Sequence, residues 1–533
     1  MSKAGFKIKA NFICKLALIM QNSPTPVICQ PPLTELLEAL LNLKERILRE
    51  TELETSKLDL EKASQASMFS ILNALNYVVM RREELHSLQS NLAEYGLSSL
   101  GRVEPHVMTN IDAVLNILSK ATTCKPYETV NQETCVDYQG GYRQLRQRSE
   151  TLFGPSPKGR SEYIMVTMPT QAAIDITLVE SFLKAGMNNA RINCAHDNES
   201  VWLKIIENIR IASRKDKQEC KILMDLAGHK IRTGQVYASK TKREKHKDKL
   251  KSPRLHQGDF FILCKDMNDL KESLSLFDVP TDVAVTCTYP AIIDLVEVNQ
   301  SIWIDDGKIG TIVKEKHAQA LLLEVKQVGP KGVRLKEEKG INLPETVLNL
   351  PTLSKKDRED LNFVSQHADL VGLSFTECAK DVLYLQAFLE DLGNQNLPIL
   401  AKIETADGVR NLPDILVQSL AQNIDLGIMI ARGDLAVELG SVRMAEIQDE
   451  ILRLCESAHI PVVWATQVME SLAKQGVISR PEISDAAMSQ RAECVMLNKG
   501  PYIVEAVRIL SEVLQRMEAH QFKSHTHMRA LHW

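Results

Sequence analysis

Three charged side chains stand directly after short apolar runs and are the residues best placed to do chemistry. Lys402 and Glu404 follow the apolar run Pro398–Ala401. Asp434 follows a second apolar run, Leu426–Ala431. Runs of this kind are typical of buried parallel strands, and a (β/α)8 barrel carries its reactive groups at the C-terminal strand ends. A lysine beside two carboxylates suits a hard divalent cation that holds an anionic substrate, although a salt-bridged barrel mouth is the alternative interpretation.

The elements that must position these side chains alternate between apolar strands and amphipathic helices. Strand-like runs lie at 162–167, 189–193, 221–225, 369–374, 397–402, 425–430, 461–465 and 493–497. Helical patterns lie among them, at 171–185, 199–213, 354–366, 378–392, 407–420, 443–458 and 501–517. The alternation predicts an α/β fold, a (β/α)8 TIM barrel, whose two parts are residues 161–234 and 339–533.

Residues 235–338 interrupt this alternation with short β-like runs that are separated by turn signals. The runs lie at 259–264, 283–288, 301–304, 311–314 and 320–328. We therefore predict an all-β lid domain inserted into the barrel. The lid includes a basic run at 240–251 without interleaved aromatic residues, which we interpret as a solvated loop and not as a nucleic-acid site.

Residues 1–120 are predicted to form an α-helical N-terminal module, and residues 121–160 a polar linker. Apolar residues recur at helical spacing in 33–62 and 66–94, and Pro105 is suited to open a third helix. The sequence leaves two interpretations open for this module. One is a helical packing or oligomerisation unit, and the other is an anion-binding loop formed by Ser98, Ser99 and Arg102.

The composition is ordinary for a soluble globular protein. The 533 residues are 44% hydrophobic and 25% charged, and the formal net charge of −4 gives no reason to expect a nucleic acid or a membrane as partner. The 11 cysteines lack CxxC pairs and metal-type spacing, so we expect reduced thiols and a cytoplasmic location. The apolar run Phe12–Met20 faintly resembles a signal peptide, but Lys15 interrupts it. No stretch approaches the roughly 18–20 apolar residues of a membrane span.

Seven stretches of the chain resemble motifs of the pyruvate kinase family, in the family's order. They are AGMNNARINCAH at 185–196, MDLAGHKIRTG at 224–234, IDDGKI at 304–309, KGINLP at 339–344, AKIE at 401–404, ARGDLAVE at 431–438 and ATQVMES at 465–471. The resemblance implies glycolytic phosphoryl transfer between phosphoenolpyruvate and ADP, giving pyruvate and ATP. It also implies a homo-oligomer.

The resemblance further implies a role for each matching residue. Lys402 and Arg191 would be catalytic cations at the transferring phosphoryl group, and Thr466 would lie next to the carbon that is protonated. Glu404 and Asp434 would hold Mg²⁺ or Mn²⁺. The substrate-binding residues would be Arg191, Lys402, Gly433, Asp434 and Thr466, with the carboxylate on the backbone N–H groups of Gly433 and Asp434. The nucleotide-binding residues would be Asn193, His196, Arg232 and Lys339.

One departure from the family's motifs concerns the monovalent cation. Ala195 and Leu226 stand where potassium-dependent members have a serine and a threonine, and Lys230 stands where they have a glutamate. What remains of that site would be Asn193, Asp225 and Lys230. Because the Lys230 ammonium can supply the charge of potassium permanently, we expect that K⁺ is not required.

A second departure follows the eighth strand, where MLNKGPY at 496–502 replaces the family's MLSGETAKGDYP and so removes an acidic Gly-rich loop. The sequence ends soon after the eighth helix, so we expect the resemblance to cover the family's barrel and lid but not its C-terminal domain. Two hypotheses follow: an active Mg²⁺-dependent pyruvate kinase, and a catalytically weak scaffold or sensor that binds phosphoenolpyruvate or nucleotide. A metal-dependent lyase is disfavoured, because the nucleotide contact at Lys339 would have no purpose in it.

Overall fold

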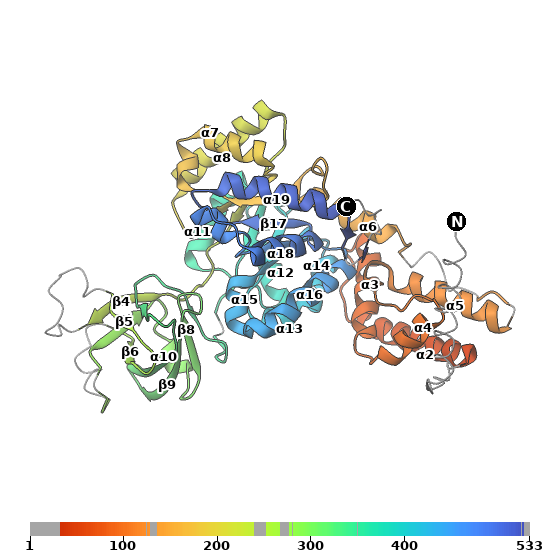
Figure 1. The fold of residues 1–533 in the computed structure, drawn as a ribbon, viewed down its shortest axis with the longest axis horizontal. Coiled ribbons are helices and arrows are strands. Elements are labelled where there is room, and N and C mark those ends of the chain that lie inside the picture. The colour runs from red at the N-terminus through yellow and green to blue at the C-terminus, as the bar shows by residue number, and fades with distance from the viewer. Residues whose placement is uncertain are drawn as a thin grey trace, which may run out of the picture.

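Three lobes make up the molecule, as Figure 1 shows: a helical N-terminal lobe, a central barrel and a β-rich lid. The computed structural model describes residues 32–123, 125–127, 136–238, 252–266, 277–279, 281–348, 350–523 and 525–526. The basic run at 240–251 and the apolar run Phe12–Met20 lie outside the described residues. Among the helices of the described ranges, none has the length and apolar character that a membrane crossing needs.

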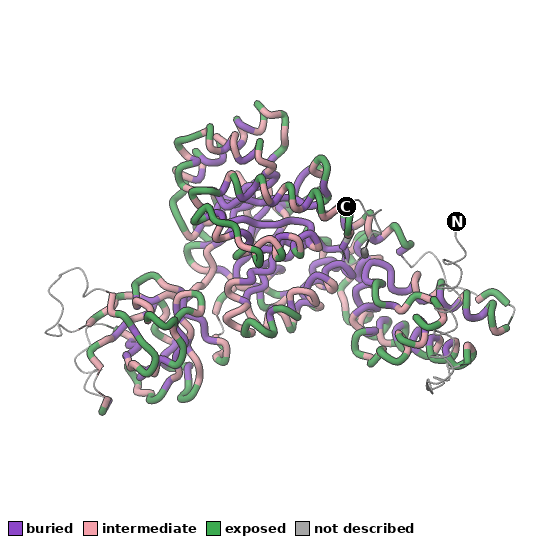
Figure 2. The backbone as a smooth tube through the Cα atoms, in the orientation of Figure 1, coloured by how far each residue is buried: buried purple, intermediate pink, exposed green. Residues whose placement is uncertain are grey.

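Eight parallel strands close the barrel, in the order β1-β17-β16-β15-β14-β13-β3-β2. They are β1 Tyr163–Thr167, β2 Asn189–Asn193, β3 Lys221–Asp225, β13 Leu370–Leu373, β14 Ile399–Ile403, β15 Leu426–Ala431, β16 Val462–Ala465 and β17 Cys494–Leu497. Nearly every strand residue is buried, as the purple centre of Figure 2 shows, because helices cover the outer face. This double burial explains why most of the strands are apolar runs, β2 with Asn189, Arg191 and Asn193 being the exception. The predicted (β/α)8 barrel is confirmed.

Helices surround the barrel, and several of them begin at a capping side chain. The helices are α7 Ile176–Ala185, α8 Glu199–Asp216, α11 Lys355–His367, α12 Ala379–Asp391, α13 Ala406–Arg410, α14 Leu412–Ala421, α15 Arg432–Leu439, α16 Ser441–Ser457, α17 Glu470–Gln475, α18 Arg480–Met488 and α19 Ile503–Glu518. The Asp175 side chain accepts from the first backbone N–H groups of α7, and Asn198 does the same for α8. Ser354 and Asp357 form a capping box at the start of α11. These caps fix where α7, α8 and α11 begin.

The lid is a curled, seven-stranded mixed sheet with the order β12-β8-β9-β10-β6-β7-β4. Its strands are β4 Thr233–Ala238, β6 Phe260–Cys264, β7 Val283–Cys287, β8 Ser301–Ile304, β9 Ile309–His317, β10 Ala320–Gln327 and β12 Ile341–Asn342. The β6–β7 pair is parallel, and the other pairs are antiparallel. Buried residues such as Phe261, Leu323 and Ile302 give the lid a core of its own. The predicted β insertion after the third barrel strand is confirmed.

The N-terminal lobe contains α2 Leu33–Thr55, α3 Gln65–Met80, α4 His86–Glu94, α5 Val107–Thr123 and α6 Gly140–Phe153. The sequence predicted one helix over 66–94, but a turn at 81–85 divides it into α3 and α4. The N–H of Arg82 donates to the Val79 carbonyl, a three-residue spacing that tightens and ends α3. Part of the predicted linker is helical, because Leu152 and Phe153 on α6 bury themselves against the barrel strands. In the loop at 96–106, Ser98 Oγ donates to Asn110 Oδ1 over 2.9 Å.

A buried histidine joins this lobe to the barrel. His459, between α16 and β16, is 0% exposed; its Nδ1 lies 2.8 Å from Ser70 Oγ on α3, and its Nε2 lies 2.9 Å from the Pro105 carbonyl oxygen. Burial, aided by the nearby Arg148 guanidinium and opposed by the hydrogen bond to Pro105, lowers the pKa of His459 to about 3. A Cβ at Gly141 would lie 2.7 Å from the His459 ring. Only glycine at position 141 therefore lets α6 approach the histidine this closely. The lobe therefore docks through specific polar contacts as well as apolar packing.

Candidate active site

The C-terminal ends of β14 and β15 bring the predicted lysine and carboxylates together. Lys402 lies within β14 and Glu404 directly follows it, and Lys402 Nζ is 3.3 Å from Glu404 Oε1. Asp434 lies in the first turn of α15, which follows β15 without a loop. The charge of Asp434 reaches Glu404, whose pKa it helps to raise. The three residues thus form one cluster at the barrel mouth.

The Lys402 ammonium is held from three sides. Its Nζ donates to Ser374 Oγ over 2.7 Å and lies 3.3 Å from Asp225 Oδ1, in addition to its contact with Glu404. Lys402 is 8% exposed, and this burial opposes its charge, but the carboxylates of Asp225 and Glu404 outweigh burial and raise its pKa. The site therefore presents a fixed positive charge at neutral pH.

Arg191 and Asp225 form a buried pair beside this lysine. Arg191 donates to Asp225 Oδ2 from Nε at 2.8 Å and from Nη2 at 2.5 Å, and its Nη1 lies 3.0 Å from Thr167 Oγ1. Burial opposes the Asp225 charge, but the cations of Lys402 and Arg191 keep its pKa below the ordinary value. One carboxylate therefore orients two cations at the mouth of the barrel, an arrangement that suits an anionic substrate.

Glu404 and Asp434 are the described carboxylates that best fit a divalent cation. Burial raises the pKa of Glu404, and the charge of Asp434 adds to this effect although Lys402 opposes it. A divalent cation would relieve that repulsion. Within the described ranges, no three His, Cys, Asp or Glu residues are grouped to hold a metal. Two protein carboxylates nevertheless fit Mg²⁺, which keeps several waters and takes further oxygens from a substrate.

The Gly433 and Thr466 pair adjoins this cluster. The Gly433 N–H, which the sequence analysis expected to be free for a substrate carboxylate, donates to Thr466 Oγ1 over 2.7 Å. Thr466 has a φ of 64°, a left-handed conformation that is costly for a β-branched residue and that is found mainly at functional sites. Arg432 supports this turn by donating to the Thr466 carbonyl oxygen over 2.7 Å. The strained turn places the threonine hydroxyl at the mouth.

A second part of the mouth is a basic pocket of about 240 Å³ where β1, β2 and β17 end. Its lining includes Arg191 and the predicted nucleotide residues Asn193 and His196, together with Lys474, Asn498 and Lys499. Burial lowers the pKa of His196, and the positive charges of Lys499 and Arg232 lower it further. This pocket can therefore accept an anionic group next to Arg191.

The other two predicted nucleotide residues lie on the lid connections. Arg232 Nη1 donates to the Glu338 carbonyl oxygen over 3.2 Å, and Lys339 Nζ lies 3.0 Å from Asp305 Oδ1. Neither is among the described residues that line the basic pocket. The structure therefore separates the predicted nucleotide residues into a pair in the pocket and a pair at the base of the lid.

Of the residues predicted as the remnant of a monovalent-cation site, Asn193 and Asp225 are register partners on β2 and β3, but Lys230 makes its ion pairs elsewhere. Asn193 Oδ1 accepts the Ala195 N–H over 3.0 Å, and Asp225 is paired with Arg191 and Lys402. The ion pairs of Lys230 in the described structure are with Asp434 and Asp306 instead. Since two cations already balance Asp225, Lys230 is drawn to the less fully paired Asp434.

Ser374 and Thr167 contact Lys402 and Arg191 and were not predicted from the motifs. Ser374 directly follows β13 and Thr167 ends β1, so both lie at C-terminal strand ends. Lys474 and Lys499 in the basic pocket were also missed. Ser374 and Thr167 could have been predicted from their positions at the ends of strands. Lys474 lies near the end of a short helix, and that position does not distinguish it from other surface lysines.

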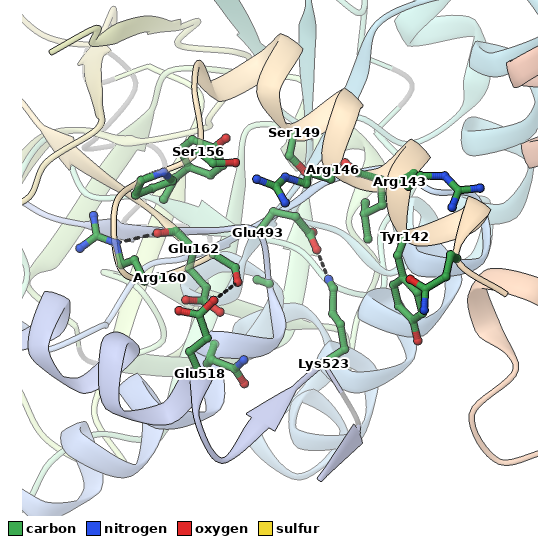
Figure 3. A pocket seen from close by; sticks show the side chains of 17 residues that line it. Tyr142, Arg143, Arg146, Ser149, Ser156, Arg160, Glu162, Glu493, Glu518 and Lys523 are labelled. Carbon is green, nitrogen blue, oxygen red and sulfur yellow. Dashed lines mark hydrogen bonds and ion pairs between the residues drawn. The ribbon is translucent and has the colours of Figure 1, made fainter. Parts of the chain in front are cut away.

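A separate cavity of about 350 Å³ lies at the opposite end of the barrel, where the strands begin (Figure 3). Glu162 and Glu493, which directly precede β1 and β17, line it, and Lys523 pairs with Glu493. Burial raises the pKa of Glu162 to about 7. None of the predicted site residues is among the described residues that line this cavity. Reactions in (β/α)8 barrels take place at the other end, so we place the candidate active site there.

Comparison of the sequence with known protein families identifies the family of this chain. The family model described as "Pyruvate kinase, barrel domain" matches residues 159–507, which is more than half of the chain. The chain belongs to the pyruvate kinase family.

Several curated members of the pyruvate kinase family are similar to this chain. A pyruvate kinase from Geobacillus stearothermophilus is 32% identical over 368 residues, which cover 68% of this chain and 57% of the relative. One from Staphylococcus saprophyticus is 31% identical over 353 residues, 64% of this chain and 55% of the relative. Pyruvate kinase PKLR from Rattus norvegicus is 32% identical over 375 residues, 68% of this chain and 60% of the relative. The chain thus spans somewhat over half the length of these relatives.

Proposed function

We propose that this member of the pyruvate kinase family transfers a phosphoryl group between phosphoenolpyruvate and ADP, giving pyruvate and ATP. The observation that carries the proposal is the Lys402 ammonium, which Ser374, Asp225 and Glu404 hold at distances of 2.7, 3.3 and 3.3 Å. Phosphoryl transfer asks a protein mainly for positioning and charge neutralisation. A buried, pre-oriented cation at a barrel mouth supplies both.

The chain's own residues divide the work. Lys402 and Arg191 neutralise the transferring phosphoryl group, and Asp225 keeps both cations oriented. Thr466 holds its hydroxyl next to the reacting carbon, where the enolate takes a proton. The basic pocket with Asn193 and His196 receives the phosphates of the nucleotide, and Arg232 and Lys339 contact it from the lid side.

Glu404 and Asp434 hold the divalent cation, Mg²⁺ or Mn²⁺, in this proposal. When bound, the cation supplies charge neutralisation for the carboxylate and enol oxygens of the substrate. Potassium is not required, because Lys402 and Arg191 already balance Asp225. Ala195 and Leu226 also offer no side-chain oxygen with which to bind a monovalent ion.

A second candidate function is a catalytically weak scaffold or sensor that binds phosphoenolpyruvate or nucleotide. The observation that favours it is the Gly433 N–H, which is donated to Thr466 instead of being free for a substrate carboxylate. Lys499 in the shortened connection between β17 and α19 also gives the mouth a basic rim where the family has an acidic one. Such a rim favours binding of anions without requiring turnover.

The test is an assay of the purified full chain with phosphoenolpyruvate, ADP and MgCl₂, in which pyruvate and ATP are both quantified. We expect equal amounts of the two products, and loss of both when ADP is omitted. Phosphoenolpyruvate binding in calorimetry without any product would contradict the kinase proposal and support the scaffold. Arg191→Lys is a useful companion variant, because it keeps the charge but loses the two-pronged contact with Asp225 and should lower turnover.

A further inference from the structure

Lys230 lies where the lid joins the barrel. It belongs to the segment between β3 and β4, which is the first of the two connections to the lid. Its Nζ is 2.8 Å from Asp434 Oδ1 on α15 of the barrel and 3.7 Å from Asp306 Oδ1 at the β8–β9 turn of the lid. One ammonium thus stands between a carboxylate of each domain.

The second lid connection leaves a channel for this side chain. A Cβ at Gly340 would lie 2.6 Å from Cε of Lys230 and 3.3 Å from its Nζ. Gly340 also forms a β-bridge with Arg232, so the two lid connections run side by side at this point. The absence of a Cβ at Gly340 therefore leaves the space that the Lys230 side chain occupies.

The position of Lys230 conflicts with a divalent cation on Asp434. Two cations on one carboxylate oxygen repel each other strongly in a partly buried site, and the Asp434 side chain is only 18% exposed. Asp306, whose side chain is 61% exposed, offers the ammonium a second carboxylate close by. A rotation of the Lys230 side chain would therefore exchange a barrel contact for a lid contact.

We propose that Lys230 is a positioning residue that links the divalent-cation site to the lid. It holds Asp434 in the conformation described here and transfers its ammonium to Asp306 when a divalent cation binds Glu404 and Asp434. The proposal rests on the divalent site of the proposed function. It has two consequences: Lys230 weakens cation binding by competing for Asp434, and a bound cation draws the β8–β9 turn toward the first lid connection.

The first test measures Mn²⁺ binding to the full chain by electron paramagnetic resonance, without phosphoenolpyruvate or nucleotide. We expect Lys230→Met to lower the Kd for Mn²⁺ by about tenfold, because Asp434 loses its competing ammonium. The matched control is Lys308→Met. It removes a lysine of the β8–β9 turn that pairs with Asp305 over 3.1 Å and not with Asp434. The control should keep the Kd of the unmutated chain. An unchanged or higher Kd for Lys230→Met overturns the proposal.

A second variant and a second readout keep the test independent of folding and turnover. Gly340→Ala displaces the Lys230 side chain without removing its charge, and should also lower the Kd for Mn²⁺. Mn²⁺ should slow amide hydrogen exchange in residues 305–308 of the unmutated chain, and Asp306→Asn should abolish this slowing. Equal exchange with and without Mn²⁺ in the unmutated chain contradicts the link to the lid.

The failure of this proposal differs from the failure of the proposed function. If the chain makes pyruvate and ATP but Lys230→Met leaves its affinity for Mn²⁺ unchanged, only the proposed role of Lys230 is wrong. A chain that binds no Mn²⁺, whether mutated or not, overturns both the link and the divalent site on which it rests.

Discussion

The Nε atom of Arg191 lies 2.8 Å from Oδ2 of Asp225, a carboxylate that is 1% exposed. The other oxygen of this carboxylate lies 3.3 Å from Lys402 Nζ. Burying a charge is costly unless it is paired, so Asp225 requires both cations, and both cations take their orientation from it. The site's positive charge is consequently built around one buried carboxylate.

Lys402→Ala should abolish phosphoryl transfer while the protein stays folded. Removing one preorganised charge from such a site costs on the order of 3 kcal/mol or more in the activation free energy, which is at least a hundredfold in turnover. Steady-state kinetics with phosphoenolpyruvate and ADP measure the effect, and circular dichroism checks the fold. Lys355→Ala is the matched control, because the Lys355 side chain is 93% exposed and its ion-pair partner is Glu359 on the same helix. Turnover of Lys402→Ala within threefold of the parent would rule out the assigned role.

Asp225→Asn should lower both the stability of the barrel and its activity. The substitution leaves the guanidinium of Arg191 and the ammonium of Lys402 buried without their shared carboxylate, which typically costs about 3–5 kcal/mol. Urea unfolding followed by tryptophan fluorescence measures the loss. Asp137→Asn removes the partner of an exposed pair with Arg143 and should cost less than about 1 kcal/mol. Equal unfolding midpoints for the two variants would contradict the structural importance given to Asp225.

The fold was largely predictable from the sequence, because its dominant signals are local. The runs 189–193 and 221–225 are the strands β2 and β3 residue for residue. Burial on both faces accounts for the apolar centre of β3, whereas β2 has only Ala190 and Ile192 as apolar residues and was located by the alternation of strands with helices. The helix over 66–94 was mispredicted as continuous, because the turn after α3 depends on packing against α14 and α16 that no periodicity records.

The residues of the candidate site were predictable from the sequence, but not all of the ion pairs among them were. Lys402 lies in β14 and Glu404 comes two residues later, directly after the strand, so their contact follows from the strand geometry continued by one residue. The partner of Lys230 depends on how the lid meets the barrel, a relationship between residues more than two hundred positions apart. The pairing of its ammonium with Asp434 was therefore not predictable from the sequence.

Activity in a buffer free of sodium and potassium should lie within about twofold of the activity with saturating potassium, because fixed cations replace the ion. Arg191 and Lys402 already balance Asp225, and Ala195 contributes no ligand oxygen. Rates measured in tetramethylammonium buffer, with and without KCl, make the comparison. We also expect Lys230→Glu to lower activity and to leave only weak potassium dependence, since the missing oxygens are not restored. Strong potassium activation of the unmutated chain would refute this account.

Stability should fall in mild acid through His459. Because burial lowers its pKa from 6.5 to about 3, the unfolded chain binds a proton below pH 6.5 that the folded chain excludes. The contribution of neutral His459 is thus complete above pH 6.5 and is lost progressively as the pH falls toward 3. At pH 5 the loss amounts to about 2 kcal/mol. Urea unfolding at pH 7.5 and pH 5 measures it.

His459→Gln provides the comparison for this pH effect. Glutamine does not titrate in this range, so the variant should lose about 2 kcal/mol less than the parent between the two pH values, whatever its stability at pH 7.5. Other titrating groups are common to both chains and cancel in the difference. Identical pH dependence in the two chains would show that His459 is not buried in its neutral form.

The central claim is that the Lys402 cluster moves a phosphoryl group to ADP. Phosphorus-31 nuclear magnetic resonance of the full chain with phosphoenolpyruvate, ADP and MgCl₂ tests it most directly, because each phosphorus atom is followed by its own signal. We predict that the phosphoenolpyruvate signal decays while the γ-phosphate signal of ATP grows by the same amount, and that Lys402→Ala shows neither change. A static spectrum with the unmutated chain, or growth of inorganic phosphate in place of ATP, would contradict the account.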